Sequence, residues 1–158
     1  MKSAYFDTSA LVKRYVSETG SKWVNNLLIP SLRLNVFTSG LTAVEAVCAF
    51  SRRMREGTLS SEDYDKLVTA FHYDMRYRYI VSDVMEITLD TACRLAESHP
   101  LRAYDAIHLA TALLLNREMI RNGREWLTFV CADDRLLDIA RAENLHTENP
   151  NNYSDISD

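Results

Sequence analysis

The chain has 158 residues and a formal net charge of −4 at pH 7, with 47% hydrophobic and 25% charged residues. This length and composition favour a single globular domain with a substantial core. The acidic balance argues against a protein whose whole surface grips nucleic acid, although a local basic groove stays open. No apolar run approaches the roughly 20 residues that span a bilayer, and the N-terminus lacks the apolar core of a signal peptide. We therefore expect no membrane partner.

The three cysteines, Cys48, Cys93 and Cys131, are far apart in the sequence and odd in number. This pattern fits a reduced protein of the cytoplasm better than a disulfide scaffold. No two cysteines have the CxxC spacing of a zinc site. We expect a cytoplasmic location and no zinc.

Apolar runs that suit strands alternate with segments of helical periodicity along most of the chain. In chain order, we expect a strand at 2–6, helices at 9–16 and 21–28, a strand at 34–38, a helix at 41–56, a helix from 60 or 61 to about 77, a strand at 79–82, helices at 85–97 and 101–112, a strand at 126–131, a helix at 135–143 and an edge strand at 145–147. This order predicts an α/β fold with a mostly parallel central sheet and helices on both faces. We expect one domain at 1–150 and a polar C-terminal tail at 151–158, with fraying from Asn149 onward.

End signals and apolar faces can also be predicted for several helices. Thr8 or Ser9 would cap the first helix, and Gly57 would end the helix at 41–56. On the buried face of the helix at 41–56 we expect Leu41, Val44, Val47, Cys48 and Met54. In the helix at 85–97 we expect to find buried Ile87, Leu89, Cys93, Leu95 and Ala96. Glu45 would lie beside the apolar face of its helix rather than opposite it.

Four acidic residues share one predicted location in this fold. Asp7 follows the first strand, Glu45 lies early in the helix after the second, Asp105 is in the first turn of its helix, and Asp133 follows a later strand. The carboxyl ends of parallel strands meet at one edge of a sheet, where ligands bind. Helix capping is the alternative for each acid; it explains Asp133 and Asp105 well, Asp7 less well and Glu45 hardly at all.

Several carboxylates brought together need a counter-charge. Two like charges about 4 Å apart repel by roughly 4 kcal/mol at an effective dielectric near 20. A protein that tolerates this usually holds a divalent cation or raises the pKa of one member. Oxygen ligands favour Mg²⁺ or Mn²⁺, and the matching chemistry is phosphodiester cleavage.

The four acidic segments together resemble a known family. They read Tyr-Phe-Asp7-Thr-Ser-Ala-Leu, Thr-Ala-Val-Glu45-Ala, Leu-Arg-Ala-Tyr-Asp105-Ala-Ile-His-Leu-Ala-Thr-Ala and Cys-Ala-Asp133-Asp-Arg-Leu-Leu. In this order and spacing they resemble the acidic blocks of PIN-domain nucleases, and most of all the VapC toxins of bacterial and archaeal toxin–antitoxin pairs. The resemblance spans nearly the whole chain. It implies a three-layer α/β/α sandwich, endoribonuclease activity with Mg²⁺ or Mn²⁺, a homodimer, and a small antitoxin as partner.

The resemblance also assigns roles to individual residues. Asp7 and Asp105 would be direct metal ligands, and Glu45 and Asp133 would complete the acidic pocket through the metal, its waters or a second ion. Ser9 would orient Asp7.

Three further positions around these blocks bear on the assignment. Thr8 is a second supporting residue beside Asp7. Cys131 stands where the family often has Thr, which leaves a supporting hydroxyl in question. Asp134 could substitute for Asp133, although the alignment of the block favours Asp133.

Other readings of the same residues are weaker. A phosphatase with an aspartyl nucleophile needs a second Asp where this chain has Ser9. A receiver domain could use Asp83 after the third strand, but it needs a lysine, and none follows Lys66. His108 could be a general base, but a packed or hydrogen-bonded histidine is favoured. An RNA-processing PIN nuclease outside a toxin–antitoxin pair, or a non-catalytic interaction protein, would share the fold.

Overall fold

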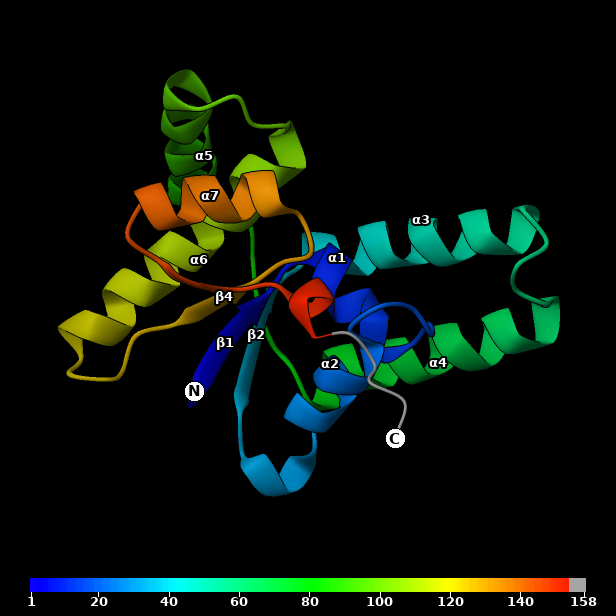
Figure 1. The fold of residues 1–158 in the computed structure, drawn as a ribbon. Helices are drawn as coiled ribbons and strands as arrows, with labels where there is room; N and C mark the ends of the chain where they lie inside the picture. The colour runs from blue at the N-terminus through cyan, green and yellow to red at the C-terminus, as the bar shows by residue number, and fades with distance from the viewer. Residues whose placement is uncertain (154–158) are drawn as a thin grey trace.

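The structure is a computed structural model that describes residues 1–153. Within these residues a five-stranded sheet has the order β3-β2-β1-β4-β5, and each neighbouring pair of strands is parallel. The strands are β1 (Ser3–Phe6), β2 (Asn35–Ser39), β3 (Ile80–Ser82), β4 (Thr128–Val130) and β5 (His146–Glu148). The α-helices are α1 (Thr8–Leu11), α2 (Ser21–Leu27), α3 (Leu41–Arg55), α4 (Ser61–Tyr77), α5 (Glu86–Ser98), α6 (Ala103–Arg121) and α7 (Asp134–Ala142). Three short 3₁₀ turns are η1 (Val12–Arg14), η2 (Pro30–Leu32) and η3 (Pro150–Asn152). Figure 1 shows how these elements are arranged.

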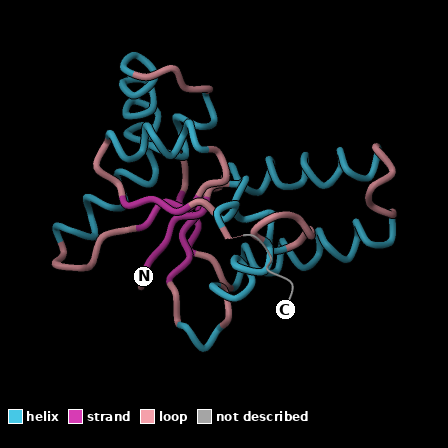
Figure 2. The backbone as a smooth tube through the Cα atoms, viewed as in Figure 1, coloured by secondary structure: helices cyan, strands magenta, loops and turns pink. Residues whose placement is uncertain are grey.

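Helices cover both faces of the sheet, which confirms the predicted three-layer α/β/α architecture. Successive side chains of a strand point to opposite faces. In β1, Ala4 and Phe6 therefore pack in one cluster with α1, α2, α3 and α4, while Tyr5 packs in a second cluster with α5, α6 and α7. Figure 2 shows the strands between these two groups of helices. The core thus consists of two layers, with the fully buried β1 shared by both.

The order of the strands reverses direction beside β1. From β1 the chain goes to β2 and β3 on one side, and then crosses to β4 and β5 on the other. The boundary between β1 and β4 is therefore the topological switch point of the sheet, where an open α/β fold forms a crevice at the carboxyl ends of its strands. Asp7 follows β1 directly, and its backbone N–H donates to the carbonyl of Val130 at the end of β4, at 3.1 Å.

The predicted elements are present with small shifts at their ends, apart from the first helix and the helix predicted at 101–112, which is α6 and continues to Arg121. The segment predicted as a helix at 9–16 is the four-residue α1 followed by the 3₁₀ turn η1. Its N-cap is Asp7, whose carboxylate accepts a hydrogen bond from the backbone N–H of Ala10, so the prediction of Thr8 or Ser9 as N-cap is wrong. Gly57 follows the end of α3 with a positive φ of 73°, as a helix-ending glycine does.

The buried face of α3 differs from the predicted one. Its buried residues are Thr42, Ala46 and Phe50, which are four residues apart, whereas Val44 is 65% exposed and Cys48 is also exposed. The Thr42 hydroxyl is hydrogen-bonded at 2.7 Å to that of Thr38 in β2. Small residues let the start of α3 approach the sheet closely, and a satisfied hydroxyl can be buried there.

The prediction for α5 was also wrong, except for Leu95. The buried residues are Thr88, Thr91, Ala92 and Leu95, whereas Ile87 and Leu89 are 49% and 46% exposed and Cys93 and Ala96 are exposed. These four buried positions have the spacing i, i+3, i+4, i+7 of a single helical face. The Thr91 hydroxyl donates to the carbonyl of Ile87 at 2.7 Å, so threonine can be buried in the contact with α6.

The start of the C-terminal segment is anchored instead of frayed. Asn149 is 4% exposed, and its side chain donates to Asp134 Oδ1 at 2.7 Å. The side chain of Asn151 donates to the carbonyl of Ala132 at 3.2 Å, and Tyr153 stacks on Trp23 with ring centroids 4.6 Å apart. The segment 149–153 therefore supports the loop between β4 and α7. Residues 154–158 of the predicted tail lie outside the described residues.

None of the helices within residues 1–153 is both long and apolar enough to cross a bilayer.

The contact between Gly20 and Pro150 gives a test of this packing. Gly20 has a φ of 84°, and a Cβ there would lie 2.4 Å from the Pro150 carbonyl oxygen. Gly57 is a matched control, because it has a φ of 73° with nothing within 4 Å. We expect Gly57→Ala to cost about 1–2 kcal/mol of unfolding free energy through backbone strain alone. Gly20→Ala should cost clearly more, because Pro150 must also move. Urea unfolding would measure both losses, and equal losses would contradict the contact.

Candidate active site

Three of the four predicted acids lie around the switch point of the sheet. Asp7 follows β1, Asp133 follows β4, and Asp105 is in the first turn of α6. Burial raises the pKa of Asp105, and the negative charges of Asp133 and Asp7 raise it further. Asp105 and Asp133 also line one pocket of about 430 Å³. The fold has therefore brought together carboxylates from positions up to 126 residues apart, the separation of Asp7 and Asp133.

Asp7 is buried and held by a set of hydrogen bonds. Ser9 Oγ lies 2.8 Å from both of its carboxylate oxygens and donates to them, and the N–H of Ala10 donates to Oδ1 at 2.9 Å. Ser9 Oγ in turn accepts the N–H of Ala132 at 2.9 Å, which joins the end of β1 to the loop after β4. Ser9 thus makes the contact that an orienting residue would make. Burial raises the pKa of Asp7, while the hydrogen bonds from Ser9 and the N–H of Ala10 oppose the rise.

Glu45 belongs to the same edge but has its own partners. Its Oε2 accepts hydrogen bonds from the Thr8 hydroxyl and from His108 Nε2, the latter at 2.7 Å. Burial by itself would raise the pKa of Glu45, but the interactions with His108 and Thr8 outweigh burial and lower it. Since Thr8 is the next residue after Asp7, its hydroxyl links the position of Glu45 to the end of β1.

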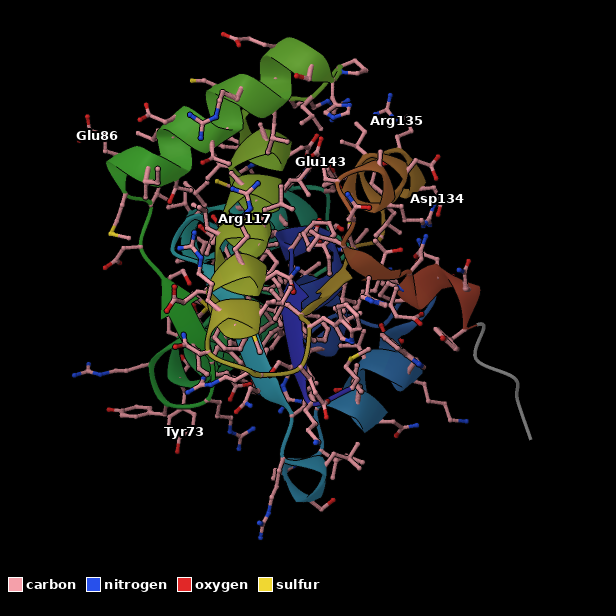
Figure 3. All side chains as sticks on the ribbon, turned by 90° about the vertical axis from the view of Figure 1, so that its left-hand side faces the viewer. Tyr73, Glu86, Arg117, Asp134, Arg135 and Glu143 are labelled. Atoms are coloured by element: carbon pink, nitrogen blue, oxygen red, sulfur yellow. The ribbon has the colours of Figure 1, made fainter. Side chains whose placement is uncertain are left out.

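The structure distinguishes between Asp133 and Asp134. Asp133 caps α7 by accepting the N–H of Arg135 at 2.9 Å, and it lines the acidic pocket with Asp105. Asp134 is exposed and bonded to Asn149, and Figure 3 shows it beside Arg135 at the start of α7. The geometry therefore favours Asp133 as the fourth acid. Cys131 Sγ accepts the N–H of Asp133 at 3.2 Å, so the thiol takes the place of a supporting hydroxyl in this loop.

Basic residues stand at the rim of the acidic pocket. Arg102 and Arg135 line it together with the two acids, and Arg135 Nε lies 3.8 Å from Asp133 Oδ1. The side chain of Arg135 is 78% exposed, so it can also reach a ligand. A larger hollow of about 810 Å³ lies against η1, α2 and α4, but none of the four acids lines it. The pocket of about 430 Å³ is therefore the candidate active site, because Asp105 and Asp133 line it.

The donor set fits a magnesium-like ion that keeps much of its water. Within residues 1–153, no three His, Cys, Asp or Glu side chains stand close enough to enclose an ion by themselves. Mg²⁺ usually keeps several waters and is held by one or two carboxylates, as Asp7 and Asp105 could do. The mutual repulsion that raises the pKa of Asp105 is the condition that a cation would relieve. A zinc site with cysteine and paired histidine ligands does not fit these residues.

Two parts of this site were not predicted from the sequence. Tyr5 and His108 form a buried polar pair behind Glu45, and Asn149 supports the loop of Asp133. The prediction of a packed or hydrogen-bonded His108 is confirmed, but its partners Tyr5 and Glu45 were not predicted. Nothing in the local sequence around Asn149 identifies Asp134 as its acceptor.

Solved structures with the same fold come from toxin–antitoxin systems and from an archaeal protein. VapBC2 from Rickettsia felis, bound to a DNA fragment from the promoter, matches with a TM-score of 0.65 and 16% identity over 93% of this chain and 98% of that one. FitAcB from Neisseria gonorrhoeae has a TM-score of 0.57 and 14% identity, covering 93% of this chain and 97% of that one. PAE2754 from Pyrobaculum aerophilum has a TM-score of 0.54 and 20% identity, covering 93% and 85%. At these identities the likeness shows the fold alone.

The comparison of sequences identifies the family. No curated protein matches the chain, but residues 4–142 match the sequence pattern of the PIN domain. That range contains all four acids and the whole switch point. Proteins with this domain are in general nucleases that depend on divalent metal ions. The chain belongs to the PIN domain family.

Proposed function

We propose that this protein is an endoribonuclease that depends on Mg²⁺ or Mn²⁺, and that it is the toxin of a type II toxin–antitoxin pair. The observation that carries the proposal is the convergence of Asp7, Asp105 and Asp133 at the switch point, where burial and mutual repulsion raise the pKa of Asp105. The toxin–antitoxin complexes among the structures of the same fold support the biological role. We further propose a cytoplasmic homodimer that binds a small antitoxin protein.

Each residue has a part in the proposed reaction. Asp7 and Asp105 would hold the metal ion, with Ser9 orienting Asp7. When bound, a divalent ion supplies water of lowered pKa and neutralises charge on the scissile phosphate. Glu45 and Asp133 would complete the acidic cluster, acting through the metal, its waters or a second ion.

The rim of the pocket would position the substrate. Arg102 and Arg135 would contact phosphates on either side of the scissile bond, because arginine donors suit phosphate oxygens and such contacts fix the register of a nucleic acid. This local positive rim offsets the overall charge of −4, which would otherwise repel RNA.

Activity of the purified protein tests the assignment of the acids. We expect RNA cleavage with Mg²⁺ or Mn²⁺ and none with a chelator, and a loss of at least about a hundredfold in Asp7→Asn and Asp105→Asn, because removing one electrostatic group from a site costs on the order of 10²–10³ in rate. Asp90→Asn, in an exposed part of α5, is the matched control. Single-stranded DNA should be tested beside RNA. Equal cleavage by the wild type and both variants would overturn the site.

Thermal unfolding provides a test that does not need a substrate. The pKa of Asp105 is raised in the folded state, so the protein is most stable with this carboxyl protonated and loses stability as the pH rises through its ordinary and then its raised pKa. Without metal at pH 7, Asp105→Asn should therefore raise Tm by on the order of 1 °C, a small value because the group is only half-buried.

Added metal should make the Tm of the wild type higher than that of Asp105→Asn. An ion at 100 times its Kd stabilises the wild type by about 2.7 kcal/mol, and Asp105→Asn should lose most of that gain. Asp90→Asn should respond as the wild type does. A wild type whose Tm ignores Mg²⁺ and Mn²⁺ would contradict a metal site.

Growth experiments test the toxin role separately from the chemistry. Expression of the wild type should arrest growth, Asp7→Asn should not, and co-expression of a small protein encoded beside the gene should relieve the arrest. A nuclease that is active in vitro but harmless, with no such neighbour, would indicate an RNA-processing enzyme instead. A protein that arrests growth equally in the Asp7→Asn form would indicate a non-catalytic interaction.

A further inference from the structure

A buried chain of polar groups lies behind Glu45. The phenol oxygen of Tyr5 is 2.8 Å from His108 Nδ1, and His108 Nε2 is 2.7 Å from Glu45 Oε2. Tyr5 is fully buried and His108 is 3% exposed. Tyr5 comes from β1, His108 from α6 and Glu45 from α3, so the series links a central strand to one helix of each helical layer.

The hydrogen bonds of this chain have one consistent direction. A phenol carries its hydrogen at neutral pH, so Tyr5 can donate it to Nδ1 across the 2.8 Å contact. A histidine that accepts at Nδ1 carries its own hydrogen at Nε2 and donates it to a carboxylate. Each member then gives one hydrogen to the next, and the series ends on the negative charge of Glu45.

A second donor acts on the same oxygen of Glu45. The Thr8 hydroxyl donates to Oε2, and Thr8 Oγ1 also lies within 3.5 Å of Thr42 Oγ1, which is bonded to Thr38. The carboxylate of Glu45 is thus held between His108 from α6 and Thr8 at the start of α1. Neither of these residues donates to the other carboxylate oxygen of Glu45, Oε1. That oxygen is therefore the one that can interact with a ligand at the acidic site.

We propose that His108 is a positioning residue for Glu45, and that Tyr5 holds His108 in the tautomer with its hydrogen on Nε2. In this arrangement His108 is no general base, because Nε2 uses its hydrogen on Glu45 and Nδ1 uses its lone pair on Tyr5. The same arrangement occurs at metal sites, where a partner of the outer nitrogen fixes the ring of a histidine. Here the ring in turn fixes a carboxylate.

Replacing His108 by glutamine or by asparagine distinguishes the roles of its two ring nitrogens. The terminal amide nitrogen of glutamine can occupy the place of Nε2 and donate to Glu45, whereas the shorter asparagine reaches only the place of Nδ1 and Tyr5. On the proposed nuclease function, His108→Gln should keep about a third or more of the wild-type kcat. His108→Asn should lose at least about tenfold in kcat, with KM for RNA little changed and Tm close to that of His108→Gln. Tyr5→Phe should have a smaller effect than His108→Asn.

Three outcomes of this comparison would overturn the proposal. If both variants lose activity equally, His108 acts by itself, as a general base would. If neither loses activity, the orientation of Glu45 by His108 has no effect. If only His108→Asn unfolds, the Tm difference accounts for the loss and the role is one of packing.

An NMR measurement tests the same chain without activity, and so distinguishes its failure from that of the proposed function. The imidazole ¹⁵N shifts of His108, assigned by their absence in His108→Gln, should show hydrogen on Nε2 and a hydrogen-bonded lone pair on Nδ1. Tyr5→Phe should remove that preference. Hydrogen on Nδ1 in the wild type, or shifts unchanged in Tyr5→Phe, would overturn the proposal even if the protein cleaves RNA.

Discussion

The burial of one carboxylate at the end of β1 is the constraint on which the rest of the site depends. Asp7 is removed from water, and removal from water disfavours a charge unless hydrogen bonds or a cation compensate. Ser9 and the N–H of Ala10 supply hydrogen bonds, and Asp7 caps the short helix α1, which begins at the next residue. Ser9 also receives the N–H of Ala132, so that the loop of the fourth acid is positioned from the same point. The remaining unfavourable charge, shared with Asp105 and Asp133, is what makes this edge suited to a cation.

The four acids are supported in different ways, which suggests different roles. Burial raises the pKa of Asp7 and of Asp105, and the hydrogen bonds to Asp7 offset its burial only in part. Glu45 has a lowered pKa because His108 and Thr8 compensate it within the protein. A metal ion would bind where negative charge is in excess, and a carboxylate with its own donors would keep its orientation with or without the ion. This division agrees with the proposed assignment of Asp7 and Asp105 as ligands and Glu45 as part of the surrounding wall.

The faces of α3 and α5 show where apolar patterns mislead. Val44, Ile87 and Leu89 are exposed, while Thr42, Thr88 and Thr91 are buried. Threonine can be buried because its hydroxyl is satisfied by the carbonyl one turn earlier, as at Thr91, or by another threonine, as at Thr42. Helices that approach a sheet or another helix closely need small side chains at the contact, and hydrophobicity alone does not report size. The spacing i, i+3, i+4, i+7 is the better guide in α5, where hydrophobicity pointed to the wrong residues.

Local signals in the sequence were enough to determine the alternation of strands and helices, the parallel sheet, and the placement of Asp7, Glu45, Asp105 and Asp133 at one edge. Periodicity and the ends of strands are properties of neighbouring residues, and the carboxyl ends of parallel strands must meet. Only the tertiary structure decided that β1 and β4 flank the switch point, that Asp133 rather than Asp134 faces Asp105, and that His108 joins Tyr5 to Glu45. These features depend on contacts between residues up to 124 positions apart, the separation of Ala4 and Thr128 in the pairing of β1 with β4. Which distant partner satisfies a buried polar group is decided by the packing of the whole chain, because the group itself can accept any donor that reaches it.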